Sequence, residues 1–169
     1  TDILLYDTRS GRLSLGSAGA DGALGDGDSN QPSLSGDGRY LVFQSASKNF
    51  APADDNGAPD VFRKDLATGG IVRVSVTDGG EGADEQSIDP SVSADGRFGV
   101  FASTAKNLDA STCNGFFNIY LRDLGSSDGR EGGTTTLISR ARGGLPDGHS
   151  LRPVISGSGR YVAFWSAAT

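Results

Sequence analysis

The sequence predicts an all-β protein built from repeated antiparallel units. One phrase occurs three times, running from Pro through a Gly-rich turn to an apolar stretch that ends in Phe, and its copies start 58 and 63 residues apart. A second phrase, which runs from Asp or Asn to Asp, alternates with the first, and its copies start 58 residues apart both times. The copies of the first phrase cover residues 32–43, 90–101 and 153–164, and those of the second cover 2–7, 60–65 and 118–123. A regular period of this length is typical of arrays of identical supersecondary units.

The first half of each unit has the pattern of a β-hairpin. Residues 32–35 form a short strand, and Gly36-Asp37-Gly38 supplies the turn residues that tolerate a positive φ. Residues 39–44 follow as a run of β-branched and aromatic residues, which favours a second strand.

The second half of the unit predicts another hairpin. A long polar loop over 47–59 leads to a third strand over 60–66, whose charged residues indicate partial exposure. A tight turn over 68–70 then precedes a fourth strand over 71–76. Each unit is therefore a four-stranded antiparallel meander.

Four-stranded units arranged radially form the blades of a β-propeller. With the strands named A to D, residues 1–31 supply strands C and D of a partial blade, and residues 153–169 supply strands A and B of another. Two full blades, over 32–89 and 90–152, lie between them, which gives three blade equivalents. Known propellers close with about four to eight blades. The chain is therefore expected either to be part of a larger propeller or to form half of a six-bladed ring of two chains.

The Pro-Ser-x-Ser-x-Asp-Gly-Arg phrase resembles the TolB-like, WD-like (PD-type, PD40) β-propeller repeat family. The resemblance covers nearly the whole chain, and one departure matters, because Ser158 stands where the other copies have Asp37 and Asp95. It implies a bacterial, extracytoplasmic protein, periplasmic or extracellular, that binds protein partners through its loops and channel. Similar repeats also form accessory domains beside hydrolases, including prolyl-oligopeptidase-type peptidases.

Composition excludes several classes of partner. The formal net charge is −6 and the 15 Lys and Arg residues are scattered, so no nucleic-acid partner is expected. No apolar stretch reaches the roughly 18 residues that a membrane span needs. The single cysteine, Cys113, cannot form an internal disulfide, and it is either a small buried hydrophobe or a link to another chain.

The B–C and D–A loops are long, and they are expected to share one face of the propeller, where function usually lies. The strongest metal candidate there is a possible calcium site formed by Asp54, Asp55, Asn56 and Asp60, since hard cations prefer closely spaced oxygen ligands. The alternative is a solvated Asn-Gly turn, because the sister loop lacks these carboxylates. No other cofactor is expected.

Catalysis has little support in the sequence. Residues 125–129 match Gly-x-Ser-x-Gly, but a strand and not the required helix is expected to follow. His149, the only histidine, is expected to be a surface loop residue, whereas Phe116, Phe117 and Trp165 could contact a partner. The chain is therefore interpreted as a non-catalytic scaffold for protein–protein interaction. The alternatives are an accessory domain of a larger hydrolase and a calcium- or carbohydrate-binding surface protein.

Overall fold

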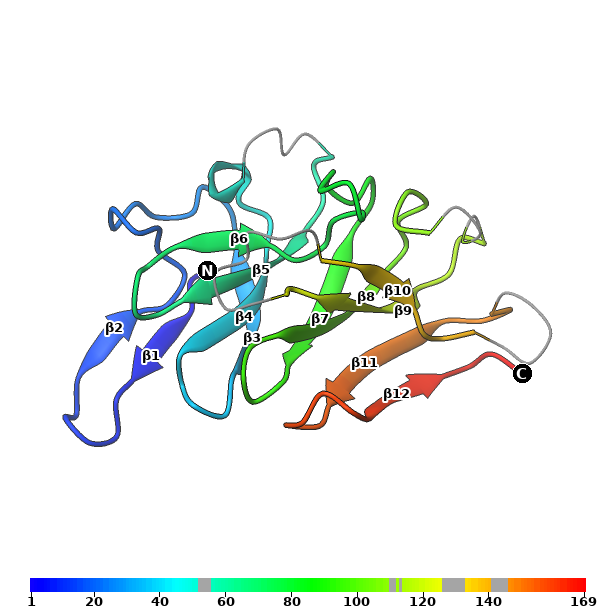
Figure 1. Ribbon diagram of the computed structural model, residues 1–169. Helices are drawn as coiled ribbons and strands as arrows, with labels where there is room; N and C mark the ends of the chain where they lie inside the picture. The colour runs from blue at the N-terminus through cyan, green and yellow to red at the C-terminus, as the bar shows by residue number, and fades with distance from the viewer. Residues whose placement is uncertain (52–55, 110–111, 113, 126–132, 141–145) are drawn as a thin grey trace.

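The computed structural model describes residues 1–51, 56–109, 112, 114–125, 133–140 and 146–169. The described residues form two four-stranded and two two-stranded antiparallel sheets, which confirms the all-β propeller prediction (Figure 1). The partial blades are β1 (Leu4–Tyr6) with β2 (Leu13–Leu15), and β11 (Ser150–Ile155) with β12 (Val162–Ser166). Blade one contains β3 (Ser29–Leu34), β4 (Tyr40–Ser45), β5 (Asp60–Asp65) and β6 (Ile71–Arg73). Blade two contains β7 (Ser87–Val92), β8 (Phe98–Ser103), β9 (Asn118–Asp123) and β10 (Thr135–Leu137).

Helix is almost absent from the described part of the chain, where the one helical element is the 3₁₀ turn η1 (Lys48–Phe50). Within the same residues, no helix has the length and apolar character to cross a membrane.

The sheets converge on their first strands. Strand β7 packs against β3, β4 and β5 of the preceding blade, and β11 packs against β7, β8 and β9 in the same way. The fourth strands, β6 and β10, lie at the far edges of their sheets (Figure 1). The first strands therefore surround the axis of the propeller arc.

Two apolar cores fill the spaces between successive sheets. One lies between the first half-blade and blade one and contains Ile3, Phe43 and Phe62. The other lies between blades one and two and includes Val61 and Phe101. Because each core draws side chains from two sheets, no sheet buries its apolar residues alone.

The strands differ from the prediction at three places. The third strand of blade one, expected to be partly exposed, is buried from Asp60 to Lys64. The first strands begin three residues early, at Ser29, Ser87 and Ser150, because each continues through a β-bulge just before its proline. The fourth strand of blade one is shorter than the predicted range 71–76. It ends at Arg73, after which the Ser75 side chain binds the Val61 backbone N–H at 3.0 Å.

A small hydrogen-bond cluster holds the tip of each complete A–B hairpin. In blade two, Ser93 Oγ donates to Asp95 Oδ1 at 2.6 Å, and the same oxygen accepts from the Arg97 N–H at 3.1 Å. The serine bond lowers the pKa of Asp95 below its ordinary value. In the last hairpin, Ser156 faces Ser158 and not an aspartate, with 3.4 Å between the two hydroxyl oxygens.

Exchanging these turn residues should move stability in opposite directions. Asp95→Ser should lower the free energy of unfolding by about 1 kcal/mol, since it removes hydrogen bonds to a charged acceptor. Ser158→Asp should raise it by a similar or smaller amount. Urea unfolding followed by circular dichroism measures both, and equal stability of the two variants would contradict this account.

Candidate functional site

The long loops meet at the end of the sheets opposite the A–B hairpin tips (Figure 1). A carboxylate on each D–A loop accepts a backbone N–H from the neighbouring B–C loop or its counterpart. The Oδ1 atoms of Asp26 and Asp84 accept from Lys48 N at 2.7 Å and from Lys106 N at 2.8 Å. Asp147 accepts from Thr169 N at 2.9 Å in the corresponding place. These acidic side chains therefore brace loop against loop.

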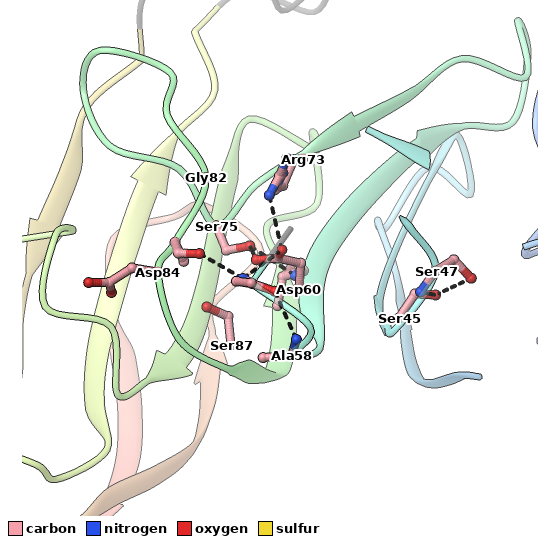
Figure 2. A network of polar contacts seen from close by, with 12 residues as sticks. Ser45, Ser47, Ala58, Asp60, Arg73, Ser75, Gly82, Asp84 and Ser87 are labelled. Atoms are coloured by element: carbon pink, nitrogen blue, oxygen red, sulfur yellow. Dashed lines mark hydrogen bonds and ion pairs between the residues drawn. The ribbon is translucent and has the colours of Figure 1, made fainter. Parts of the chain in front are cut away.

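Asp60 is the most buried carboxylate on this face, with no exposed surface. Its Oδ2 atom lies 3.1 Å from the Arg73 guanidinium, and its Oδ1 atom accepts from Ser75 Oγ at 2.5 Å (Figure 2). Asn56 Nδ2 lies 3.4 Å from Oδ2 and donates more closely, at 2.7 Å, to the Ala83 carbonyl. The charge of Asp60 is thus compensated by protein groups at the point where the B–C loop enters β5.

Blade two contains a neutral version of the same network. Asn118 stands in place of Asp60, and Leu137, which pairs with Tyr120 as Arg73 pairs with Phe62, stands in place of Arg73. Asn118 Nδ2 donates to Asn114 Oδ1 at 3.1 Å and to the Phe116 carbonyl at 3.0 Å. The position therefore has a structural role in both blades, through an ion pair in blade one and through amide hydrogen bonds in blade two.

The predicted calcium residues divide into two pairs. Asp54 and Asp55 lie outside the described residues, whereas Asn56 and Asp60 make the contacts given above. No group of three or more His, Cys, Asp or Glu side chains suited to a metal occurs among the residues that the structure describes. Calcium binding at this loop stays a prediction.

An aromatic cluster marks the same face one blade further on. Phe116 and Phe117, from the B–C loop of blade two, are half-buried, and His149 is exposed on the segment leading into β11. The ring centroids of Phe116 and His149 lie 5.2 Å apart in an edge-to-face arrangement, and Nδ1 of His149 accepts from the Phe117 N–H at 3.1 Å. The prediction of a surface loop position for His149 is thus confirmed, and its ring also fixes both phenylalanines.

The aromatic cluster, defined by Phe116, Phe117 and His149, has no counterpart in blade one. The equivalent positions hold Ala58, Pro59 and Gln86. Since the scaffold tolerates small or polar residues there, folding does not require aromatic rings at these places.

Besides the aromatic cluster, the structure has a second unusual feature. It occurs in the first strands, which surround the axis of the propeller arc. Gln31, Asp89 and Arg152 have positive φ angles of 52°, 54° and 53°, and each directly precedes a proline. Non-glycine residues held there cost of order 1–3 kcal/mol each, and such strain collects at sites where the surroundings impose it. At two of the three positions the residue also bonds to the preceding blade. The Asp89 N–H donates to Gln31 Oε1 at 2.9 Å, and the Arg152 N–H donates to Asp89 Oδ2 at 3.2 Å.

These axial residues were not among the sequence candidates. Their signal was a polar residue recurring before the same proline in every copy. The pre-proline position by itself favours extended backbone, so the left-handed geometry could not be read from it.

The remaining candidates fall in different places. Trp165 is exposed on β12, where it pairs with Leu151 of β11. Cys113 and residues 126–129 of the Gly-x-Ser-x-Gly match lie outside the described residues.

Comparison of the sequence with protein families gives no match, and comparison with curated proteins gives none either. Solved structures are similar to it at low identity. TolB from Acinetobacter baumannii aligns with 96% of this chain, with a TM-score of 0.54 and 22% identity, and the aligned part is 31% of that TolB chain. The putative TolB from Agrobacterium tumefaciens aligns with 99% of this chain, with a TM-score of 0.57 and 18% identity, and the aligned part is 51% of that protein. A prolyl endopeptidase aligns with 98% of this chain, with a TM-score of 0.56 and 18% identity, and the aligned part is 22% of the peptidase.

The chain thus spans about half or less of the length of each of these structures. At such identities the likeness shows the fold alone, which is the β-propeller fold of TolB and of related propeller proteins.

The Asp60–Arg73 ion pair yields a prediction for which blade two is the reference, because the equivalent residues of blade two are neutral. Arg73→Leu should lower the free energy of unfolding by about 3–5 kcal/mol, because it strips the opposing charge from a buried carboxylate. The double variant Asp60→Asn with Arg73→Leu, which copies blade two, should recover most of this loss. Thermal and urea unfolding of the three proteins measure the effect, and a double variant no more stable than Arg73→Leu would refute the charge explanation.

The predicted calcium site has its own expected outcome. Calcium at 100 times its dissociation constant should stabilise the fold by about 2.7 kcal/mol, and EDTA should reverse this. Asp55→Asn should abolish the response, whereas Asp26→Asn, on the neighbouring loop, should leave it in place. An unchanged melting temperature in EDTA would exclude the site.

Proposed function

We propose that this chain is a non-catalytic propeller scaffold that binds a protein partner through its long-loop face. The observation that carries the proposal is the aromatic cluster of Phe116, Phe117 and His149. It is partly exposed, is held in one geometry, and is not needed by the equivalent loop of blade one. Aromatic residues are enriched in protein interfaces because they bury much area with few rotatable bonds.

The surroundings of the cluster favour binding without rearrangement. The Ser150 N–H donates to the Phe117 carbonyl at 2.8 Å, and the Ala167 N–H donates to the His149 carbonyl at 2.9 Å. Both loops are therefore held by backbone hydrogen bonds to the last half-blade in the unbound protein. A preorganised surface loses less conformational entropy on binding, which supports a stable complex.

The resemblance to TolB-like propellers supports an extracytoplasmic location, periplasmic or extracellular, for this scaffold. The similarity to a prolyl endopeptidase structure favours a second candidate, in which the same face would lie against the catalytic domain of a larger hydrolase. Both candidates use the long-loop face for a protein contact. They differ in whether the partner belongs to another polypeptide.

Site-specific photo-crosslinking tests the proposal. A benzophenone amino acid at position 116 should capture one protein species reproducibly from the source cells, and the same group at Ala67, an exposed residue in the C–D turn of the opposite face, should not. The double variant Phe116→Ser with Phe117→Ser should weaken binding of the captured partner at least tenfold, the size expected for interface anchors. Equal capture from both faces, or unchanged binding by the double variant, would refute the proposal.

A further inference from the structure

Two asparagines hold the backbone of Phe116 on both sides. Its N–H donates to Asn114 Oδ1 at 3.1 Å, and its carbonyl accepts from Asn118 Nδ2 at 3.0 Å. The Asn114 Nδ2 group also donates to the Pro146 carbonyl at 3.0 Å, which ties the B–C loop to the segment that carries His149. Side-chain and backbone amides do not titrate in the physiological range, so these bonds are independent of pH.

The backbone of Phe117 is held by one bond between amides and by one bond to an imidazole. Its carbonyl accepts from the Ser150 N–H at 2.8 Å. Its N–H donates to Nδ1 of His149 at 3.1 Å. In the described part of the chain, His149 is the one titratable group bonded to the backbone of either phenylalanine. Because Nδ1 is an acceptor, the ring is neutral and carries its single proton on Nε2.

The equivalent loop pair of blade one lacks this bond. Pro59 stands at the place of Phe117 and has no N–H to donate, so no acceptor is needed there. Gln86 stands at the place of His149. The N–H that needs an acceptor and the imidazole that supplies one therefore occur together at the second loop pair, and both are absent from the first.

Protonation of the His149 ring replaces an attractive contact with a repulsive one. An imidazolium has an N–H on both nitrogens and no acceptor atom. The new Nδ1–H would face the Phe117 N–H across the same 3.1 Å, donor against donor. The His149 carbonyl accepts the Ala167 N–H at 2.9 Å, which holds the backbone of His149 in place. The protonated ring must therefore turn away about its side-chain bonds.

The turn of this ring changes the surroundings of both phenylalanines. The centroid of the His149 ring lies 5.2 Å from that of Phe116 and 5.8 Å from that of Phe117. When the ring leaves, each phenylalanine loses an aromatic neighbour and the Phe117 N–H is left to water. The aromatic cluster then has no fixed geometry at its centre.

The charged groups on the elements packed around His149 do not compensate an imidazolium. Among the described residues, these groups are Asp109 on the B–C loop, Asp147 on the segment before β11, and Arg152 on β11, and none lies on β12. Asp109 Oδ2 accepts from the Arg140 guanidinium at 2.9 Å, and Asp147 accepts from the N–H and hydroxyl of Thr169 at 2.9 and 3.0 Å. Arg152 has the same sign of charge as an imidazolium. Protonation of His149 therefore gains no ion pair within the described part of the chain.

We propose that protonation of His149 controls partner binding at the long-loop face, an inference that rests on the function proposed above. At neutral pH the unprotonated ring holds Phe117, and the aromatic cluster binds its protein partner. In mild acid the imidazolium turns away and the partner is released. Free imidazole takes up its proton near pH 6.5, so the change falls between about pH 7.5 and about pH 5.5. The other bonds of the loop do not titrate, so the fold stays intact while the surface changes.

Nuclear magnetic resonance tests the structural step without any partner. From about pH 7.5 to about pH 5.5, the Phe117 N–H should lose roughly five- to tenfold in hydrogen-exchange protection, the size expected for one hydrogen bond. The loss should follow the titration of the His149 ring protons. The Ala58 N–H, which donates to Asn56 Oδ1 at 2.8 Å in blade one, is the control and should keep its protection. Unchanged protection of Phe117 across the titration would overturn the proposal.

Two variants at position 149 separate the bond from its titration. His149→Gln copies Gln86 of blade one, and its amide oxygen accepts an N–H without titrating, so Phe117 should stay protected at both pH values. His149→Leu has no acceptor, so protection should be low at both. A glutamine variant with the pH dependence of the wild type would overturn the role of His149.

The affinity of the unmodified protein for the partner captured at position 116 tests the functional step. The dissociation constant should rise about tenfold or more from about pH 7.5 to about pH 5.5, and it should stay constant for His149→Gln. Equal wild-type affinity at both pH values would overturn the regulation and leave the proposed function standing. Failure to capture any partner would refute the proposed function and the regulation with it. A pH dependence that His149→Gln retains would belong to the partner, and it too would overturn the proposal.

Discussion

Burial of each sheet against the preceding sheet is the constraint on which this structure depends. A four-stranded sheet of this size has two faces and cannot bury both within itself, so its apolar side chains enter cores shared with a neighbour. The same dependence explains the hairpin glycines, the interblade hydrogen bonds at the axis and the exposed residues on the half-blades. A blade with neighbours on both sides buries its apolar side chains, whereas a half-blade leaves some of its apolar side chains exposed.

The sequence predicted the repeating parts of the fold because those parts are local. The turn at residues 36–38 and the following aromatic strand lie within a dozen residues of each other, so their chemistry is visible in one phrase. The bulge before each proline escaped prediction, because the pre-proline position by itself favours extended backbone. The early end of β6 also escaped prediction, since Ser75 turns inward to bind the neighbouring strand.

The site was predicted less well than the fold, and the carboxylates show why. Asp60 in sequence belongs to a run of oxygen ligands, but in space it faces Arg73, thirteen residues away along the chain. The loop acids Asp26 and Asp84 likewise cap backbone amides of the neighbouring loop. From composition alone, such acids are simply negative charges that could bind a ligand. In the structure, their hydrogen bonds position the loops. The aromatic pair at Phe116 was visible in the sequence as a break in the repeat, but its histidine neighbour came from a loop 32 residues away.

The hydrogen bonds along the axis run in one direction only. A side-chain acceptor on one blade receives the strained N–H of the next, from Gln31 to Asp89 and from Asp89 to Arg152. Arginine has no side-chain acceptor, so the Arg152 side chain cannot receive an N–H in the way that Gln31 and Asp89 do. The blades are consequently not interchangeable despite their similar sequences. Their order is encoded at the axis, where a polar amide, an acid and a base follow one another.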